Sequence, residues 1–269
     1  MKCILLYISL FLTGAGQLAA QDSNFTYLKT VKEEIVRFTV DNLDNIYLVN
    51  SDGRIKKLNA AGDSVAVFND VRRFGPLYSI DASNPLKVLL YYKDFGTIVV
   101  LDRFLNLRNT IDLRRNNILQ VTALGQSYDN KIWLYDEVEN KLKKIDEEGR
   151  LLSETADFRQ LFGEAPAPKQ VLDQEGFVYL YDPEKAVYIF DYYGALKNQL
   201  PFKHWAHFKV LGRFLFGLEN DTLHRYQLHT LDLVENKLPQ TLQAALQINF
   251  TASRLYALKK EGLEIYSFR

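Results

Sequence analysis

The chain alternates between short apolar segments and polar turns along most of its length. In residues 130–150 (NKIWLYDEVENKLKKIDEEGR), Ile132 and Leu134 fall on one face of an extended strand, and Trp133 and Tyr135 fall on the other. The polar stretches DEVEN and DEEG follow the two apolar segments. Alternation with a period of two, bounded by turn residues, predicts a strand, a turn, a second strand and a second turn.

Six segments of the chain fit this strand–turn–strand template. Their first apolar residues are separated by 36 to 46 residues, and they are Ile46, Val88, Ile132, Val178, Phe214 and Leu255. Another apolar stretch lies upstream of each, and a further short apolar piece lies downstream of each of the first five. A repeat of about 40 residues with four strands is typical of a β-propeller.

The two ends of the chain indicate how the ring closes. The sixth copy ends at Arg269, after its third strand, and a spare strand at residues 25–31 (FTYLKTV) precedes the first copy. Pairing the two would cover two exposed strand edges. We therefore expect an all-β fold: one domain, residues 21–269, forming a six-bladed β-propeller of four-stranded blades, whose ring is closed by the N-terminal strand pairing with the C-terminal blade. Five blades with an irregular region is the alternative, because the fifth copy is short. Outside the strands we expect only single helical turns, at residues 158–162 or 242–246.

Residues 1–20 have the pattern of a signal peptide. Lys2 precedes the apolar run ILLYISLFL, and two alanines stand before Gln21. This run of nine residues is too short to span a bilayer, which takes about 20, so we expect no transmembrane segment after the signal is removed. The one cysteine, Cys3, leaves with the signal, and the rest of the chain must be stable without a disulfide.

The charge of the chain is balanced, with 33 Lys and Arg against 33 Asp and Glu. Such a balance provides no overall attraction to nucleic acid or to an anionic membrane. The leader and the lack of cysteine after it are typical of a bacterial envelope protein, such as those of the Bacteroidota. We expect a monomeric periplasmic protein whose partner is another envelope protein. An extracellular location, or one on the periplasmic face of the outer membrane through a partner, is the alternative.

The first and third copies carry motifs of a known repeat. The segments DNLDNIYLVNSDGRIKKLNAAGD and DNKIWLYDEVENKLKKIDEEGR place polar residues before an apolar strand and end in a tight turn. Arg54 and Ile55 stand at an arginine–isoleucine position, which Lys141 occupies in the third copy, and residues 146–149 form the closing turn. These two copies resemble the repeats of NHL-type propellers, and the other four match only in pattern. The resemblance implies a secreted six-bladed propeller that binds proteins or ligands, although the same fold also carries lactonases and lyases.

The sequence provides few metal ligands in a usable arrangement. The acidic turn at residues 136–140 (DEVEN) has the oxygen atoms of a calcium loop but neither its spacing nor its glycine. His204 and His207 are three residues apart, and His224 and His229 are five apart, so in a strand each pair would point to opposite faces. We therefore expect no metal ion and no cofactor.

Catalytic residues are not assigned by any motif. The chain has no G-x-S-x-G segment, and we expect it to be non-enzymatic. The alternative is a lactonase-like, metal-dependent hydrolase or lyase with its site in the central channel. The polar residues near the innermost strands that such a site would use are Asp41, Asp81, Asp173 and Asn249.

The connections between blades carry the most informative composition. In a propeller they all emerge on one face, together with the turns between the second and third strands. Here they combine basic and aromatic residues, namely Arg72, Arg73, Phe74, Arg114, Arg115, Arg159, Phe162, Lys203 and Trp205. Arginine and aromatic residues are enriched in interaction hot spots, so we predict a protein-binding face there. Two alternatives stay open: the aromatic residues plug the ends of the blades, or Trp205 and Phe162 stack on a small ligand or glycan.

Overall fold

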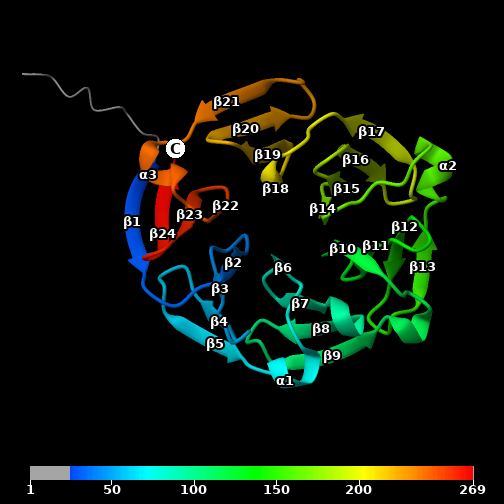
Figure 1. Ribbon diagram of the computed structural model, residues 1–269, viewed down its shortest axis with the longest axis horizontal. Helices are drawn as coiled ribbons and strands as arrows, with labels where there is room; N and C mark the ends of the chain where they lie inside the picture. Colours follow the sequence, from blue (N-terminus) through cyan, green and yellow to red (C-terminus); the bar gives the residue numbers. More distant parts are fainter. Residues whose placement is uncertain (1–24, 269) are drawn as a thin grey trace, which may run out of the picture.

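The computed structural model describes residues 25–268, with only the backbone of Val71, Arg72 and Phe268. The predicted leader, residues 1–20, lies outside the described residues. The described chain forms six four-stranded antiparallel sheets arranged as the blades of a ring (Figure 1). The six-bladed β-propeller predicted from the repeats is therefore confirmed.

Within blades 1 to 5 the strands follow one another in chain order from the centre of the ring outward, and in blade 6 the outermost strand is β1. Blade 1 consists of β2 (Arg37–Val40), β3 (Ile46–Val49), β4 (Ile55–Leu58) and β5 (Ser64–Phe68). Blade 2 consists of β6 (Ser79–Asn84), β7 (Lys87–Tyr92), β8 (Thr97–Asp102) and β9 (Leu107–Asp112). Blade 3 consists of β10 (Val121–Gln126), β11 (Ile132–Asp136), β12 (Lys141–Ile145) and β13 (Leu151–Glu154).

The second half of the ring repeats this order. Blade 4 consists of β14 (Gln170–Gln174), β15 (Phe177–Asp182), β16 (Ala186–Asp191) and β17 (Leu196–Leu200). Blade 5 consists of β18 (Ala206–Leu211), β19 (Phe214–Glu219), β20 (Thr222–Gln227) and β21 (Leu233–Lys237). Blade 6 consists of β22 (Gln247–Phe250), β23 (Arg254–Lys259), β24 (Gly262–Phe268) and β1 (Phe25–Val31).

Blade 6 is built from both ends of the chain, as predicted. Strand β1 pairs antiparallel with β24, with Phe25 opposite Phe268 and Val31 opposite Leu263. A β-bulge between Tyr27 and Lys29 interrupts the register. Figure 1 shows β1 (blue) beside β24 (red). The pairing fastens the ring and covers the strand edges that would otherwise be exposed.

The core lies between the blades. Among the described residues, buried side chains form six clusters, and each cluster joins two neighbouring blades. The middle strands are therefore covered on both sides; in β11, for example, every residue is buried. Burial of apolar surface on both faces of each sheet is the main stabilising contribution available to a chain that relies on no disulfide.

Strand β12 carries two consecutive buried lysines, although an alternating strand is expected to bury only one of two consecutive residues. Lys143 and Lys144 are both buried, because neighbouring blades cover both faces of the sheet. Each amine has a carboxylate partner at 2.8 Å: Lys143 Nζ pairs with Asp136, and Lys144 Nζ pairs with Asp129. The acidic turn that follows β11 thus has a structural role, because Asp136 neutralises a buried lysine.

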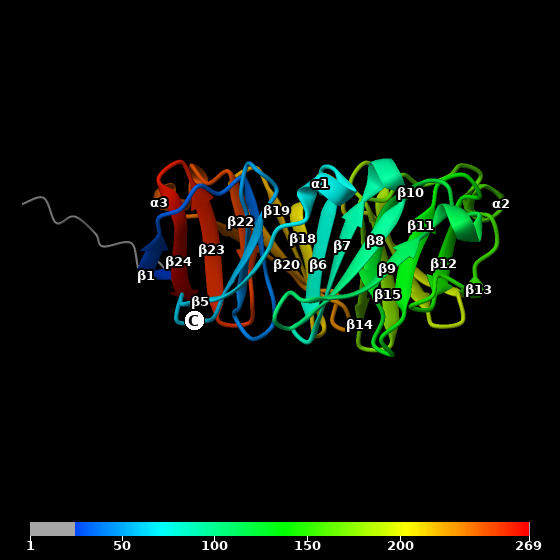
Figure 2. The same ribbon diagram turned by 90° about the horizontal axis from the view of Figure 1, so that it is seen from below.

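The helices are single turns in the connections between blades. They are α1 (Val71–Phe74), α2 (Phe158–Phe162) and α3 (Gln240–Gln243), with 3-10 turns η1 (Lys93–Phe95) and η2 (Arg114–Asn116). Figure 2 shows α1, α2 and α3 along the same face of the ring. The turn predicted at residues 158–162 is confirmed, and the turn α3 begins two residues before the predicted position. No helix in residues 25–268 is long and apolar enough to cross a membrane.

Candidate functional site

One face of the ring carries the connections between consecutive blades, and we call it the connection face. These connections contact the turns between second and third strands. Arg114 Nη2 donates to the carbonyl oxygen of Asp94 at 2.6 Å, and the backbone N–H of His204 donates to the carbonyl oxygen of Pro183 at 2.7 Å. The sequence-based expectation that connections and turns share a face therefore agrees with these contacts.

The basic residues predicted for this face are exposed where the structure describes them. Arg73, Arg114, Arg115, Arg159 and Lys203 all have exposed side chains, whereas the side chain of Arg72 lies outside the described residues. They belong to connections of different blades and do not form one cluster.

Acidic residues of the same loops neutralise most of these arginines. Arg159 pairs with Asp157 at 2.6 Å, and Arg115 pairs with Asp112 at 3.2 Å. The hydrogen bonds from Arg159 hold the pKa of Asp157 below its usual value. Exposed pairs of this kind contribute little to stability. They leave the guanidinium groups available to a partner but give the face no strong positive field.

The three aromatic residues predicted for the face pack into the ends of the blades. Phe74 is 6% exposed and lies 5.2 Å from the ring of Tyr92. Trp205 is 4% exposed and stacks on Phe202 at 4.2 Å. Phe162 is partly buried against the cluster between blades 3 and 4. This packing corresponds to the alternative in which the aromatics plug the blades, and it leaves Trp205 no free ring face for stacking on a glycan.

A set of exposed apolar residues lies closer to the axis of the ring and was not predicted. Each stands one or two positions before an innermost strand, at the mouth of the central channel, and is 38 to 65% exposed. We call this set the channel rim; it consists of Val36, Tyr78, Leu119 and Leu246. The sequence does carry a signal for it, namely an apolar residue at the equivalent position of four repeats.

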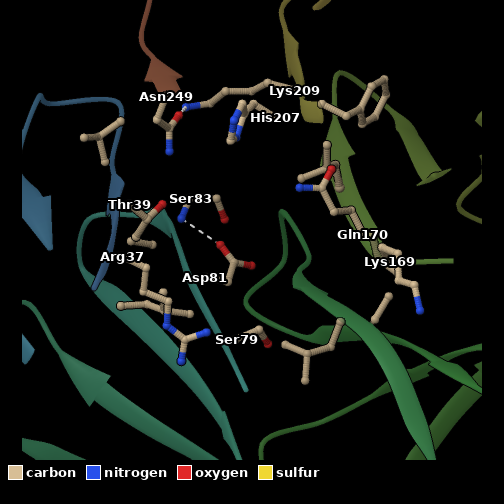
Figure 3. A pocket seen from close by; sticks show the side chains of 18 of the residues that line it. Arg37, Thr39, Ser79, Asp81, Ser83, Lys169, Gln170, His207, Lys209 and Asn249 are labelled. Atoms are coloured by element: carbon tan, nitrogen blue, oxygen red, sulfur yellow. Dashed lines mark hydrogen bonds between the residues drawn. The ribbon is translucent and has the colours of Figure 1, made fainter. Parts of the chain in front are cut away.

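The innermost strands of all six blades line a central channel with a volume of about 420 Å³ (Figure 3). Its charged lining residues are Arg37, Lys169, Lys209 and Asp81. Three are cations and one is an anion. The channel therefore favours negatively charged groups more than the balanced charge of the whole chain suggests.

Lys209 and His207 project from β18 toward β22. Lys209 Nζ donates to Asn249 Oδ1 at 2.9 Å and to the carbonyl oxygen of Phe250 at 2.6 Å. Burial lowers the pKa of Lys209 to about 8. Burial also lowers the pKa of His207, whose Nε2 accepts a hydrogen bond from the backbone N–H of Ile248. Lys209 is thus a cation of the channel wall that can lose its proton in mildly alkaline solution, whereas His207 is neutral at pH 7.

Arg37 and Asp81 are held by backbone groups of neighbouring strands. Arg37 donates to the carbonyl oxygens of Leu77 and Tyr78. Asp81 accepts hydrogen bonds from the backbone N–H groups of Ser83 at 2.8 Å and Gln126 at 2.6 Å. Figure 3 shows the carboxylate of Asp81 and its bond to Ser83 within the channel. Both charged groups connect neighbouring strands or blades and are fixed in position.

Strands β10 and β14 approach each other closely. Gly125 lies at this point, and a Cβ atom placed on it would be 2.2 Å from the carbonyl oxygen of Val171. No side chain fits between the two backbones at that distance. Glycine is therefore required by the close approach of the strands.

Of the polar residues named for the alternative channel site, Asp81 and Asn249 line the channel, whereas Asp41 and Asp173 are not among its lining residues. Asp41 binds its own turn through Leu43 and Asn45, and Asp173 accepts from the indole N–H of Trp133 in the preceding blade. Among residues 25–268, no three His, Cys, Asp or Glu side chains are grouped as metal ligands.

Comparisons with known proteins identify the fold. No protein-family model and no curated protein matches the chain. Among solved structures, a streptogramin B lyase has a TM-score of 0.59 at 16% identity, with 86% of this chain and 78% of that chain covered. The chain described as BBS1N, in complex with ARL6DN, has a TM-score of 0.58 at 11% identity, with 92% and 98% covered.

A third similar structure comes from a bacterial surface protein. PorZ of Porphyromonas gingivalis, described as an essential surface component of the type-IX secretion system, has a TM-score of 0.56 at 14% identity. The match covers 89% of this chain and 33% of PorZ. Identities this low establish the propeller fold alone, and the three proteins have different functions.

Proposed function

We propose that this protein is a non-enzymatic, protein-binding β-propeller of the bacterial cell envelope that binds its partner through the connection face. The observation that carries the proposal is the channel rim, a set of exposed apolar side chains around a channel mouth. Exposed apolar residues surrounded by polar and charged groups are typical of protein-binding surfaces. The exposed arginines of the connections would form the polar border of the contact.

The comparisons support parts of this proposal. One similar propeller is described in a complex with another protein, and another is described as a surface component of a secretion system. The leader pattern supports export, and we place the protein in the periplasm. The motifs in blades 1 and 3 support a relation to NHL-type propellers.

A partner capture with matched variants tests the contact face. In the rim variant, Val36, Leu119 and Leu246 are each replaced by serine. In the control variant, Leu43, Leu86 and Leu231, which are exposed in turns of the opposite face, are each replaced by serine. Exposed positions of this kind have little effect on folding, and circular dichroism and thermal unfolding confirm it for each variant.

We expect the rim variant to retain about one tenth or less of the partner, because removing several apolar contacts weakens a hot spot by more than tenfold. Quantitative mass spectrometry after capture from the native envelope measures the retained partner. The control variant should capture as much as the wild type. Equal capture by the rim variant, or loss only in the control variant, would contradict the proposed face.

The second candidate is a lyase or other enzyme acting in the channel. It is favoured by the fold shared with a streptogramin B lyase and by the channel amine of Lys209, whose pKa of about 8 suits proton transfer near neutral pH. Incubation with a streptogramin B, followed by mass spectrometry, separates the candidates. We expect no conversion above the buffer control. Conversion that is lost on replacing Lys209 by Gln would favour the enzyme.

A further inference from the structure

The amine of Lys209 is a channel cation whose hydrogen-bond acceptors are neutral, although the more distant carboxylates of Asp41 and Asp44 favour its charged form. Its described acceptors, Asn249 Oδ1 and the carbonyl oxygen of Phe250, are both neutral, and it forms no ion pair with any described residue. An ammonium group in a partly desolvated site is stabilised most by a nearby anion. The arrangement therefore favours a negatively charged ligand group beside Nζ.

A structural role for Lys209 does not by itself require a positive charge. The amine connects blades 5 and 6, and the neutral side chain of Gln247 makes the equivalent connection between blades 6 and 1. Gln247 Nε2 donates to the carbonyl oxygen of Phe38 at 2.9 Å, and its Oε1 accepts from the backbone N–H of Phe38 at 3.1 Å. An amide therefore suffices to join two innermost strands, so the hydrogen bonds of Lys209 do not by themselves require a charged group.

Two other polar atoms of the channel wall lack a partner. The hydroxyl of Thr122 and Oε1 of Gln170 are buried and have no hydrogen bond within the described part of the chain. Both residues line the same channel as Lys209. Buried polar atoms are nearly always hydrogen-bonded, and an exception at a cavity points to a ligand or water. The Thr122 hydroxyl can donate to a carboxylate, as the Lys209 amine can.

The remaining charges of the channel also favour an anion. Lys169 lies directly before β14, at the end of the channel nearest the rim, and its side chain is exposed. The single anionic lining residue, Asp81, already accepts two backbone N–H groups. An acidic group entering from the rim would pass Lys169 before it reaches the wall of β18.

We propose that the central channel is a carboxylate-binding site in which Lys209 anchors an acidic side chain of a peptide segment docked on the connection face. The inference rests on the proposed function, since the segment belongs to the partner bound there. Apolar residues of the segment contact the channel rim, and its carboxylate enters the channel. The carboxylate accepts from the Lys209 amine, and Lys169 attracts it at the mouth.

A titration with defined probes tests the site without the partner. The probe is a triglutamate peptide with acetylated and amidated ends, compared with the matched triglutamine peptide and with free glutarate. Binding is followed by NMR at low ionic strength and pH 6.5. We expect the wild type to bind triglutamate in the millimolar range or tighter, glutarate more weakly, and triglutamine not at all.

Single-residue variants test whether triglutamate binds in the channel. Replacing Lys209 by Gln, the residue type that joins blades 6 and 1, should weaken triglutamate binding by about tenfold or more, because a charge-assisted hydrogen bond is lost. Replacing Lys169 by Gln should weaken it about threefold, since a charge at the mouth acts at longer range. The control is Lys197→Gln, an exposed lysine of the outermost strand β17, and should change the affinity less than about twofold.

The pH dependence gives an independent measure. The carboxylate stays ionised above pH 5, whereas the Lys209 amine loses its proton as the pH rises through about 8. Affinity for triglutamate should therefore fall by about tenfold or more between pH 7 and 9.5. The charged groups around Lys209 are Asp41 and Asp44 of the turn after β2, Arg37 of β2, Asp81 of β6, Lys169 of β14 and the neutral His207 of β18.

The outcomes separate this inference from the proposed function. No triglutamate binding, or binding that Lys209→Gln leaves unchanged, overturns the carboxylate site even if the rim variant loses its partner. Glutarate binding as tight as triglutamate overturns the peptide as the source of the carboxylate. If triglutamate binding depends on Lys209 and the rim variant still captures its partner in full, the carboxylate site is supported. Only the proposed contact face is then contradicted.

Discussion

Replacing Asp136 by Asn is expected to lower the free energy of unfolding by about 3 kcal/mol, because the change leaves the buried Lys143 without its nearest counter-ion. Both side chains are at most 5% exposed, and their charged atoms are 2.8 Å apart. Glu139 also reaches Lys143 at 3.0 Å, but it is 44% exposed and compensates only in part. Urea denaturation followed by circular dichroism measures the loss.

The Asn variant removes the charge of Asp136 but keeps the hydrogen bond that this side chain makes within its own turn. Asp136 Oδ1 also accepts from the backbone N–H of Val138 at 3.0 Å, and the Asn side chain retains an oxygen for that bond. The double variant Asp136→Asn with Lys143→Met removes the unpaired charge and should recover more than half of the loss. A single variant within about 0.5 kcal/mol of the wild type, the range of ordinary surface substitutions, would contradict a structural role for the pair.

A methyl group at Gly125 should have an effect of similar size. Its Cβ would lie 2.2 Å from the carbonyl oxygen of Val171, a backbone atom that cannot turn away. Relieving the contact requires β10 and β14 to separate, and we expect Gly125→Ala to cost about 3 kcal/mol. That corresponds to a fall in Tm of about 6 to 12 °C for a domain of this size. Differential scanning calorimetry measures the shift.

Gly176 provides the matched control. A Cβ at this position would meet no atom within 4 Å, but the backbone has a φ of +88°, which disfavours a side chain. Gly176→Ala should therefore cost only about 1 kcal/mol, the effect of conformation alone. If the two alanine variants unfold at the same temperature, the close approach of β10 and β14 does not limit stability.

The fold could be predicted because each blade repeats its own turns and alternation. The strand at residues 25–31 coincides with β1, and its pairing with the last blade follows from the incomplete sixth copy. The burial of Lys143 and Lys144 could not be predicted, because alternation indicates two faces of a strand but not whether a neighbouring blade covers both. Gly125 gave no signal, since its role depends on a strand more than forty residues away.

The candidate site was predicted less well than the fold. The sequence indicated which loops share a face, and Arg114 and Arg115 are exposed on it. It could not show that Trp205 packs inside the blade, because an aromatic residue in a loop is equally compatible with both positions. Nothing in the sequence distinguishes Lys209 from other polar residues of alternating strands, because its neutral hydrogen-bond acceptors come from the neighbouring blade.

The blade shared by the two ends of the chain determines the order in which the molecule can assemble. Blades 1 to 5 each contain strands that are adjacent in the sequence, so they can form as soon as their own residues are available. Strand β1 is made first, yet it pairs with residues 263–268 and must wait for the whole chain. Closing so long a loop is entropically costly and slow. Until β1 pairs with β24, the innermost strands do not surround a channel. Ligand binding in the channel would therefore indicate that the ring is complete.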